Sequence, residues 1–346
     1  MRWPWVLVAV MAALLVRIPA ITSLPMDWDE AIYLEAANAV AMAVHTGDWS
    51  SVFEVSINPE HPGLVKVLYG IGISIHGEGC GLIEQLATVR GISLLAGVAA
   101  VGLAAWVHPV AGLVLATHTL HAKYSCEGYL DALPSFWMAA AMVLAWKYRK
   151  TPEHRNMILV ATCWGAAIAG KWLHGLPGLV LLWFMVDWRV RIRVMLSALL
   201  AAWLLDPTMW MDPFGRVLAM LAHHNGYAET LSVPSNIWTP WAFLAMGGPS
   251  DWHPESFPFS IDGLWLVMGM AGMAYGCIKR DAWAVYVASW FGLCLLFLMV
   301  WPTRWPQHTM VLLVPLSFGC ALAAQPLLSF ASLRFGPSDS RRPTSG

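Results

Sequence analysis

The fold of this chain is decided near its beginning, where the apolar run WPWVLVAVMAALLVRIPAI (Trp3–Ile21) leads into the acidic stretch MDWDEAIY (Met26–Tyr33). A helix of about 20 apolar residues is long enough to cross the hydrocarbon core of a bilayer. The run has no convincing small-residue cleavage site, so we interpret it as a first membrane span, with a cleaved signal peptide as the alternative. The span would deliver the carboxylates of Asp29 and Glu30 to the membrane surface.

The rest of the chain has the same apolar character. Of its 346 residues, 58% are hydrophobic and 12% are charged, whereas about a quarter of the residues of soluble domains are charged. Apolar segments recur along nearly the whole length, and no separate soluble domain is visible. We therefore predict an all-α polytopic membrane protein, with one domain over residues 1–325 and a cytoplasmic polar tail over 326–346. The net charge of −1 does not indicate a polyanionic partner, and we expect no nucleic acid to bind.

The positions of Lys and Arg decide the predicted topology, because cations are concentrated on the cytoplasmic side of membrane proteins. All the cationic clusters become cytoplasmic if the short apolar segment 64–75 lies along the outer face of the membrane and does not cross it. Both termini are then inside. The clusters are at 147–150, 189–193, 279–280 and 334–342. The resulting bundle has about ten spans, at 3–21, 86–107, 110–120, 132–146, 157–170, 176–188, 194–205, 261–278, 282–301 and 310–324.

This topology leaves two long loops on the outer face, at about 22–85 and 206–260. In the first loop, residues 29–45 alternate between apolar and polar positions in a way that suits an interfacial helix, and Gly47 would end it. The cytoplasmic connections are short. We therefore expect the function to reside on the outer face.

Four groups of polar residues converge on that face. A pair of carboxylates such as Asp29 and Asp131 can supply a general base for an acceptor hydroxyl, or can hold a divalent metal through oxygen ligands. Lys171 and Arg304 lie outside against the cation bias, which suggests that they bind an anion such as a lipid phosphate. Interfacial anchoring and snorkelling are the alternative roles for each charged residue. The groups are Asp29 with Glu30, Glu60 with His61, Glu127 with Asp131, and Lys171 with Arg304.

The histidines and cysteines give no clear metal signature. No H-E-x-x-H or comparable set is present, so we interpret the pairs His118 with His121 and His223 with His224 as structural residues. The six cysteines form no C-x-x-C pair, and most lie within apolar runs. Cys80 and Cys126 share the outer face in this topology, which leaves a disulfide between them open.

At pattern level, these residues resemble polyprenyl-phosphate-dependent glycosyltransferases of the GT-C fold, specifically the protein O-mannosyltransferase and aminoarabinose-transferase-like group. The segment from His61 to Lys66, His-Pro-Gly-Leu-Val-Lys, is similar to that family's His-Pro-Pro-Leu-x-Lys. The other matches are Asp29-Glu30 with Tyr33, Arg90, Leu130-Asp131, Gly170-Lys171-Trp172 and the segment around Arg304.

The resemblance implies a GT-C-like bundle and an inverting transfer of sugar from a polyprenyl-phosphate carrier to an acceptor on the non-cytoplasmic face. It implies that Asp29 is the base or the acceptor-positioning group. A bound divalent metal at Asp29 and Asp131 stays open, and no other cofactor is implied. The resemblance and the four polar groups together predict the site. The predicted catalytic residues are Asp29, Glu30 and Asp131, the donor-phosphate residues are Lys171, Arg304 and Arg90, and the substrate-positioning residues are Glu60, His61, Lys66 and Glu127.

Three departures from the family's pattern stand out: Gly63 replaces a proline, Trp305 replaces a usual Tyr, and no C-terminal soluble domain follows. A catalytically inactive GT-C-like subunit of a membrane complex therefore remains as an alternative. A separate alternative is a transporter or flippase for a lipid phosphate, in which the same cations would line a path. We expect a multi-pass protein of a bacterial or archaeal plasma membrane. Its expected partners are membrane lipid, a lipid-linked sugar, an acceptor that is protein, lipid or glycan, and a membrane subunit.

Overall fold

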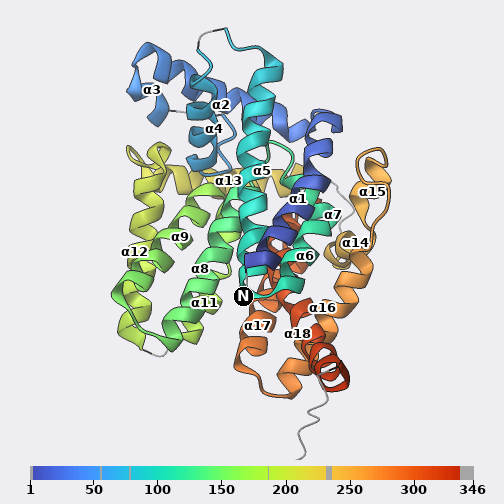
Figure 1. Cartoon of the computed structure of the whole chain (residues 1–346). Coiled ribbons are helices and arrows are strands. Elements are labelled where there is room, and N and C mark those ends of the chain that lie inside the picture. The colour runs from blue at the N-terminus through green and yellow to red at the C-terminus, as the bar shows by residue number, and fades with distance from the viewer. Residues whose placement is uncertain (1–2, 55–56, 78, 186, 231–235, 336–346) are drawn as a thin grey trace, which may run out of the picture.

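The computed structural model describes residues 3–335 apart from 55–56, 78, 186 and 231–235, and over these residues it contains helices and no strand. The predicted all-helical membrane bundle is confirmed (Figure 1). The predicted spans correspond to α1 (Trp3–Ser23), α5 (Leu82–Val107), α6 (Pro109–Thr117) with α7 (Thr119–Tyr124), α8 (Ala132–Lys150), α9 (His154–Gly170), α11 (Gly178–Phe184), α12 (Trp188–Leu205), α16 (Asp262–Ile278), α17 (Ala282–Val300) and α18 (Met310–Phe335).

Shorter helices connect these segments. The first long loop contains α2 (Trp28–Thr46), α3 (Trp49–Phe53) and α4 (Leu64–Ser74). The second contains η1 (Pro207–Met209), α13 (Pro213–Thr230), α14 (Thr239–Ala245) and α15 (Gly248–Trp252). Two further short elements, α10 (Trp172–Gly175) and η2 (Pro306–Thr309), follow α9 and precede α18.

The distribution of apolar and polar side chains is that of an integral membrane protein surrounded by lipid. In the described part of the chain, four helical segments are long and apolar enough to cross a membrane: Trp3–Ser23, Leu82–Val107, Ala282–Val300 and Pro306–Gln325. On α1, the side chain of Leu15 is 71% exposed whereas Arg17 is fully buried. Apolar residues that face outward and polar residues that face inward are favourable when the solvent is a hydrocarbon.

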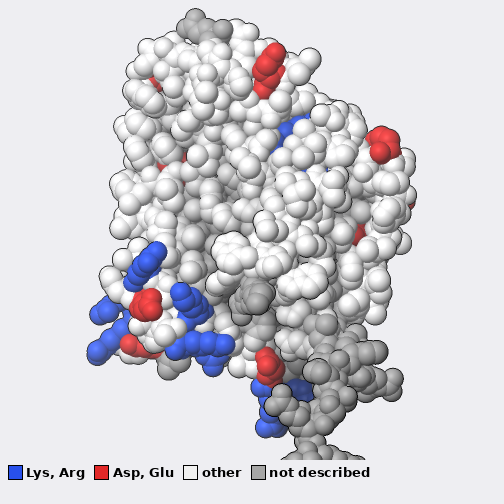
Figure 2. Space-filling model, in the orientation of Figure 1, with Lys and Arg blue, Asp and Glu red and all other residues white. Residues whose placement is uncertain are grey.

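The two ends of the bundle differ in charge. Figure 2 shows Lys and Arg gathered at one end, which we call the basic end. Figure 1 shows α2, α3 and α4 at the opposite end, so α4 does not cross the bundle, in agreement with the predicted topology. The basic end carries Lys147, Arg149 and Lys150 of α8, Arg189, Arg191 and Arg193 of α12, and Lys279 and Arg280 of the α16–α17 turn.

α2 begins and ends where its sequence predicts. The Asp27 side chain accepts a hydrogen bond from the Trp28 N–H at 2.6 Å. It also accepts one from the Glu30 N–H, and the Glu30 side chain accepts one from the Asp27 N–H at 3.0 Å, which together form a capping box. The helix ends at Gly47, whose φ of 71° is the left-handed conformation that glycine adopts without strain. The capping box fixes the orientation of the first turn of α2, which carries Asp29.

α6 and α7 form one interrupted span, with the break at His118. A break leaves backbone groups without helical partners, and these must be satisfied inside the bundle. Arg17 of α1 donates to the carbonyls of Leu115 and Ala116 at 3.0 and 2.9 Å, and Asp262 of α16 accepts from the Thr119 N–H at 3.1 Å. These contacts hold α7 and the loop that follows it.

All six cysteines are free, so the Cys80–Cys126 disulfide left open by the sequence does not form. Cys126 is buried in the bundle, where its thiol donates to the Arg17 carbonyl at 3.5 Å, whereas Cys80 is partly exposed in the loop before α5. At the other end of the chain, α18 continues to Phe335, past the predicted end of the last span. Residues 336–346 of the predicted tail lie outside the described residues.

Candidate functional site

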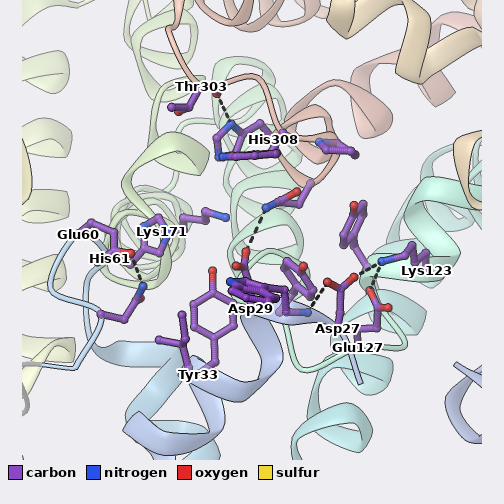
Figure 3. Close-up of a pocket in the computed structure, with 18 of the residues that line it drawn as sticks. Asp27, Asp29, Tyr33, Glu60, His61, Lys123, Glu127, Lys171, Thr303 and His308 are labelled. Carbon is purple, nitrogen blue, oxygen red and sulfur yellow. Dashed lines mark hydrogen bonds and ion pairs between the residues drawn. The ribbon is translucent and has the colours of Figure 1, made fainter. Parts of the chain in front are cut away.

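A cavity of about 960 Å³ lies at the end of the bundle opposite the basic end. Its wall is built from the first long loop, α7 and the loop after it, Lys171, α13, α15 and η2. The two long loops predicted to share one face therefore meet at one site. Figure 3 shows Asp29 in the middle of this cavity, with Glu60, His61 and Lys171 on one side and Asp27, Lys123 and Glu127 on the other.

Asp29 lies in the first turn of α2 and is partly buried in the cavity wall. Its Oδ2 accepts a hydrogen bond from Gln307 Nε2 at 3.2 Å. Burial raises the pKa of the Asp29 carboxyl above its usual value, and nearby Asp27, Asp131 and Glu60 add to this effect, whereas Lys171 opposes it. A carboxylate with a raised pKa is a stronger base, so Asp29 is well suited to accept a proton.

Lys171 is paired with Asp131, which is in turn held by His174. Its Nζ is 2.8 Å from Asp131 Oδ2, and His174 Nε2 is 3.0 Å from Asp131 Oδ1. Burial raises the pKa of Asp131, but the Lys171 ammonium and the His174 hydrogen bond outweigh it and lower the pKa to about 2. Asp131 is fully buried and is not among the described residues that line the cavity. It therefore positions Lys171 from behind the described wall, and no contact with the cavity supports its predicted catalytic role.

The loop at residues 57–61 contributes Asn58, Glu60 and His61 to the cavity wall, and these residues carry unpaired polar atoms. Within the described part of the protein, Asn58 Oδ1, Glu60 Oε2 and His61 Nδ1 are buried and have no hydrogen-bond partner. Lys66 of α4 donates to the carbonyls of Ile57, Asn58 and His61 at 3.3, 2.6 and 3.0 Å, so it fixes the loop from behind. The predicted positioning residues Glu60 and His61 thus line the cavity. Lys66 is not among the described lining residues, and it contacts the carbonyls of the loop that carries them.

Gly63, which departs from the resembled His-Pro-Pro pattern, has a specific place in the structure. Its N–H donates to Asp206 Oδ2 at 2.8 Å, which a proline could not do. A Cβ at this position would lie 2.4 Å from Thr208 Cγ2. The glycine therefore allows the first loop to pack against η1 in the second.

Glu30 and Arg90, predicted as catalytic and phosphate-binding residues, pair with each other instead. Arg90 Nε and Nη2 lie 2.9 and 2.7 Å from the two carboxylate oxygens of Glu30. Arg90 also donates to the carbonyls of Ile21, Leu24 and Pro25. Such a fork-to-fork pair uses the planar donors of arginine fully. The pair joins the end of α1 to α2 and α5, and neither residue is among the described residues on the cavity wall.

Arg304 was predicted to bind the donor phosphate. Its neighbours Thr303 and Trp305 line the cavity, but Arg304 is not among the described lining residues. Its guanidinium donates to the carbonyls of Leu298 and Met299 at 3.0 and 2.5 Å. These are among the last carbonyls of α17, which have no partners within the helix. We therefore assign these two contacts of Arg304 to capping α17, and its predicted role in phosphate binding stays a prediction.

Several cavity residues were not identified from the sequence. His223 and His224, predicted as structural residues, line the wall, and His224 Nε2 accepts from the Trp172 indole at 3.3 Å. His118 and His121 are buried in the bundle. Asp27 and Lys123 were also missed, although the i,i+4 spacing of Lys123 and Glu127 was a usable signal.

The arrangement of donors does not favour a bound metal. Over the residues that the structure describes, no three His, Cys, Asp or Glu side chains gather as ligands. Both oxygens of Asp131 are engaged by Lys171 and His174, so Asp29 and Asp131 do not form the metal-binding pair that the sequence left open. We assign no step to a metal.

Comparison with known proteins gives a match in structure. No family model matches the sequence, and no curated protein does. The structure is similar to crystal structures of ArnT from Cupriavidus metallidurans, one in the apo state and one bound to undecaprenyl phosphate. Both are 18% identical with TM-scores of 0.62; they cover 96% and 95% of this chain, and 62% and 63% of ArnT.

The chain thus spans less than two thirds of the length of ArnT. At this level of identity the similarity shows a shared fold. The chain has the GT-C membrane fold that its motifs predicted.

Proposed function

We propose that this protein is an inverting membrane glycosyltransferase that moves a sugar from a polyprenyl-phosphate-linked donor to an acceptor hydroxyl. The observation that carries the proposal is Asp29, a carboxylate with a raised pKa that shares one cavity with the ammonium of Lys171. A base and a phosphate-binding cation are the two groups that such a transfer requires. The binding of undecaprenyl phosphate by ArnT, a protein of the same fold, supports a lipid phosphate as the carrier.

In the proposed reaction, the oxygen of the acceptor hydroxyl attacks the anomeric carbon of the donor sugar, and Asp29 takes the proton from that hydroxyl. The bond from that carbon to the phosphate oxygen breaks, and the bonding electrons leave with the polyprenyl phosphate. Lys171 offsets the charge on the departing phosphate, and Asp131 with His174 keeps its ammonium in place. Attack from the side opposite the phosphate inverts the anomeric configuration.

The wall formed by Asn58, Glu60 and His61 fits the donor sugar. Its unpaired atoms, Asn58 Oδ1, Glu60 Oε2 and His61 Nδ1, would each gain a partner from a sugar hydroxyl. Burial lowers the pKa of His61 well below its usual value, and Lys171 and Lys66 lower it further. His61 is therefore neutral near pH 7, with one nitrogen that donates and one that accepts.

The orientation of the protein follows from its cations. If the basic end faces the cytoplasm, the cavity opens on the non-cytoplasmic side. There it would meet a lipid-linked donor in the membrane and an acceptor from the water. We place the protein in a bacterial or archaeal plasma membrane. The proposed acceptor is a protein, a lipid or a glycan, and the proposed partner is a membrane subunit.

The proposal is tested by measuring sugar transfer from radiolabelled polyprenyl-phosphate donors to a mixture of acceptors by the full chain in lipid nanodiscs. Asp29→Asn should slow the release of sugar by about 100-fold or more, and Asp48→Asn, at an exposed aspartate outside the cavity wall, should not. Binding of the donor to both variants would show that the cavity is intact. Movement of donor across liposome membranes without sugar release would favour a transporter and contradict the proposal.

A further inference from the structure

Three charged side chains form a separate cluster in the cavity. Lys123 Nζ lies 2.7 Å from Asp27 Oδ2 and 2.7 Å from Glu127 Oε2. Lys123 is 2% exposed and Glu127 is fully buried. In Figure 3 this cluster lies on the side of Asp29 away from Lys171 and His61. The proposed transfer step uses none of its members.

Glu127 has one carboxylate oxygen that the protein leaves unpaired. Lys123 engages Oε2, whereas Oε1 is buried without a partner among the described residues. A buried polar atom without a hydrogen bond costs free energy, so each such atom needs an explanation, such as a bound partner. Because Glu127 is on the cavity wall, a bound group can supply the missing hydrogen bond.

The charges of the cluster exclude an anionic ligand. Lys123 carries the ammonium of this cluster and is already paired with Asp27 and Glu127, so an added anion would be left without a counter-ion. Burial raises the pKa of Glu127 to about 8, and Lys123 opposes this shift without cancelling it. The Lys123 ammonium already occupies the place between the two acidic groups that an added cation would take, and near pH 7 the cluster is close to neutral, so a neutral ligand is favoured. A hydroxyl group suits Oε1 because it can both donate and accept.

Aromatic rings lie beside the charges. Lys123 Nζ is 4.5 Å from the ring centroid of Tyr124 and 5.6 Å from that of Tyr129, and both tyrosines line the cavity. The two rings meet edge to face at 5.1 Å. A surface that joins aromatic rings to a few fixed polar groups is typical of sites for small organic ligands. A saccharide ring has both the apolar C–H face and the hydroxyls for such a surface.

We propose that Glu127, Lys123 and Asp27 form a second subsite that binds the hydroxyl groups of a neutral saccharide on the acceptor. The subsite places that saccharide next to Asp29. The assignment of the bound saccharide as the acceptor rests on the proposed glycosyltransferase function, whereas its binding at Glu127 does not.

The test uses the full chain in nanodiscs and three methyl glycosides of matched shape: methyl glucoside, which is neutral, methyl glucosaminide, which is cationic, and methyl glucuronide, which is anionic. Dissociation constants are measured by NMR titration, and the binding of polyprenyl phosphate is measured on the same samples. Glu127→Ala removes the subsite, Glu127→Gln keeps its hydrogen-bonding capacity, and Glu84→Ala is a control at an exposed glutamate of α5.

We expect the neutral glucoside to bind best and Glu127→Ala to weaken it about tenfold. Glu127→Gln should weaken it less than about threefold, and Glu84→Ala should have no effect. Polyprenyl phosphate should bind equally to all four proteins. This last result also shows that the variants are folded.

Three results would overturn the subsite: no binding of the neutral glucoside to the native protein, unchanged binding to Glu127→Ala, or a preference for the charged glycosides. If any of them occurs while polyprenyl phosphate binds normally, the subsite fails and the proposed transferase survives. If the glucoside depends on Glu127 but polyprenyl phosphate does not bind, the subsite stands and the proposed transferase fails.

Discussion

The pair of Lys171 and Asp131 gives the most quantitative prediction, because both partners are buried and both carboxylate oxygens of Asp131 have a partner. Replacing Asp131 with Asn removes the charge that balances the Lys171 ammonium 2.8 Å away. The pKa of Asp131 is about 2 against an ordinary 3.8, a difference that corresponds to about 2 kcal/mol in favour of the ionised form. Leaving the ammonium buried and unpaired adds to this loss, and breaking a buried pair costs about 3–5 kcal/mol. We expect Asp131→Asn to lower the free energy of unfolding by about 3 kcal/mol.

The assay is a double-mutant cycle of Asp131→Asn and Lys171→Met, with the free energy of unfolding measured by denaturant titration in mixed micelles. Removing both charges should recover most of the loss, because no ion then remains unpaired. The double variant should regain stability and yet not transfer sugar, since Lys171 is absent. The stabilisation by Asp131 is complete above about pH 4 and is lost as the pH falls through about 2. The coupling energy from the cycle should therefore be constant from pH 5 to 8. A coupling energy below about 0.5 kcal/mol would refute the assigned role.

Three further predictions follow from the same contacts. Gly63→Ala should destabilise the protein by about 1–3 kcal/mol, because its Cβ would lie 2.4 Å from Thr208 Cγ2, and a thermal unfolding midpoint equal to that of the native protein would contradict this packing. Arg90→Lys should lower the unfolding midpoint and leave the affinity of the folded protein for polyprenyl phosphate unchanged, whereas a selective loss of that affinity would return Arg90 to the phosphate site. The pH profile of kcat/KM should fall on the acid side with a midpoint above the ordinary carboxyl value of 3.8, because burial raises the pKa of Asp29 and only its ionised form accepts a proton; a midpoint at or below 3.8 would show that Asp29 does not set the rate.

The topology could be predicted from the sequence because the cations mark one end of the bundle so clearly. The clusters at 147–150, 189–193 and 279–280 agree with one another if the segment 64–75 does not cross, and α4 lies at the opposite end as that reasoning requires. The position of Asp29 was predictable for a local reason. Asp27 and Glu30 cap the same helix turn, so the residues between them are fixed by contacts within four positions of sequence.

The roles of the other charged residues could not be predicted, because they depend on partners far away in the sequence. Glu30 pairs with Arg90 across 60 positions, and Asp131 pairs with Lys171 across 40. Charge and position near a span end are the same for a residue that binds substrate and for one that holds two helices together. It could be predicted from the sequence that these residues lie at one end of the bundle, but not which of them face the cavity.

The most direct test of the central claim is the single-turnover rate of sugar transfer by the native chain and by Asp29→Asn, both loaded to the same extent with polyprenyl-phosphate-linked donor. Loading both proteins equally separates the chemical step from donor binding. If Asp29 is the general base, the variant should be slower by about 10²–10⁴-fold while its affinity for the donor is unchanged. A variant that transfers sugar within about threefold of the native rate would contradict the account, because general-base catalysis contributes far more than that.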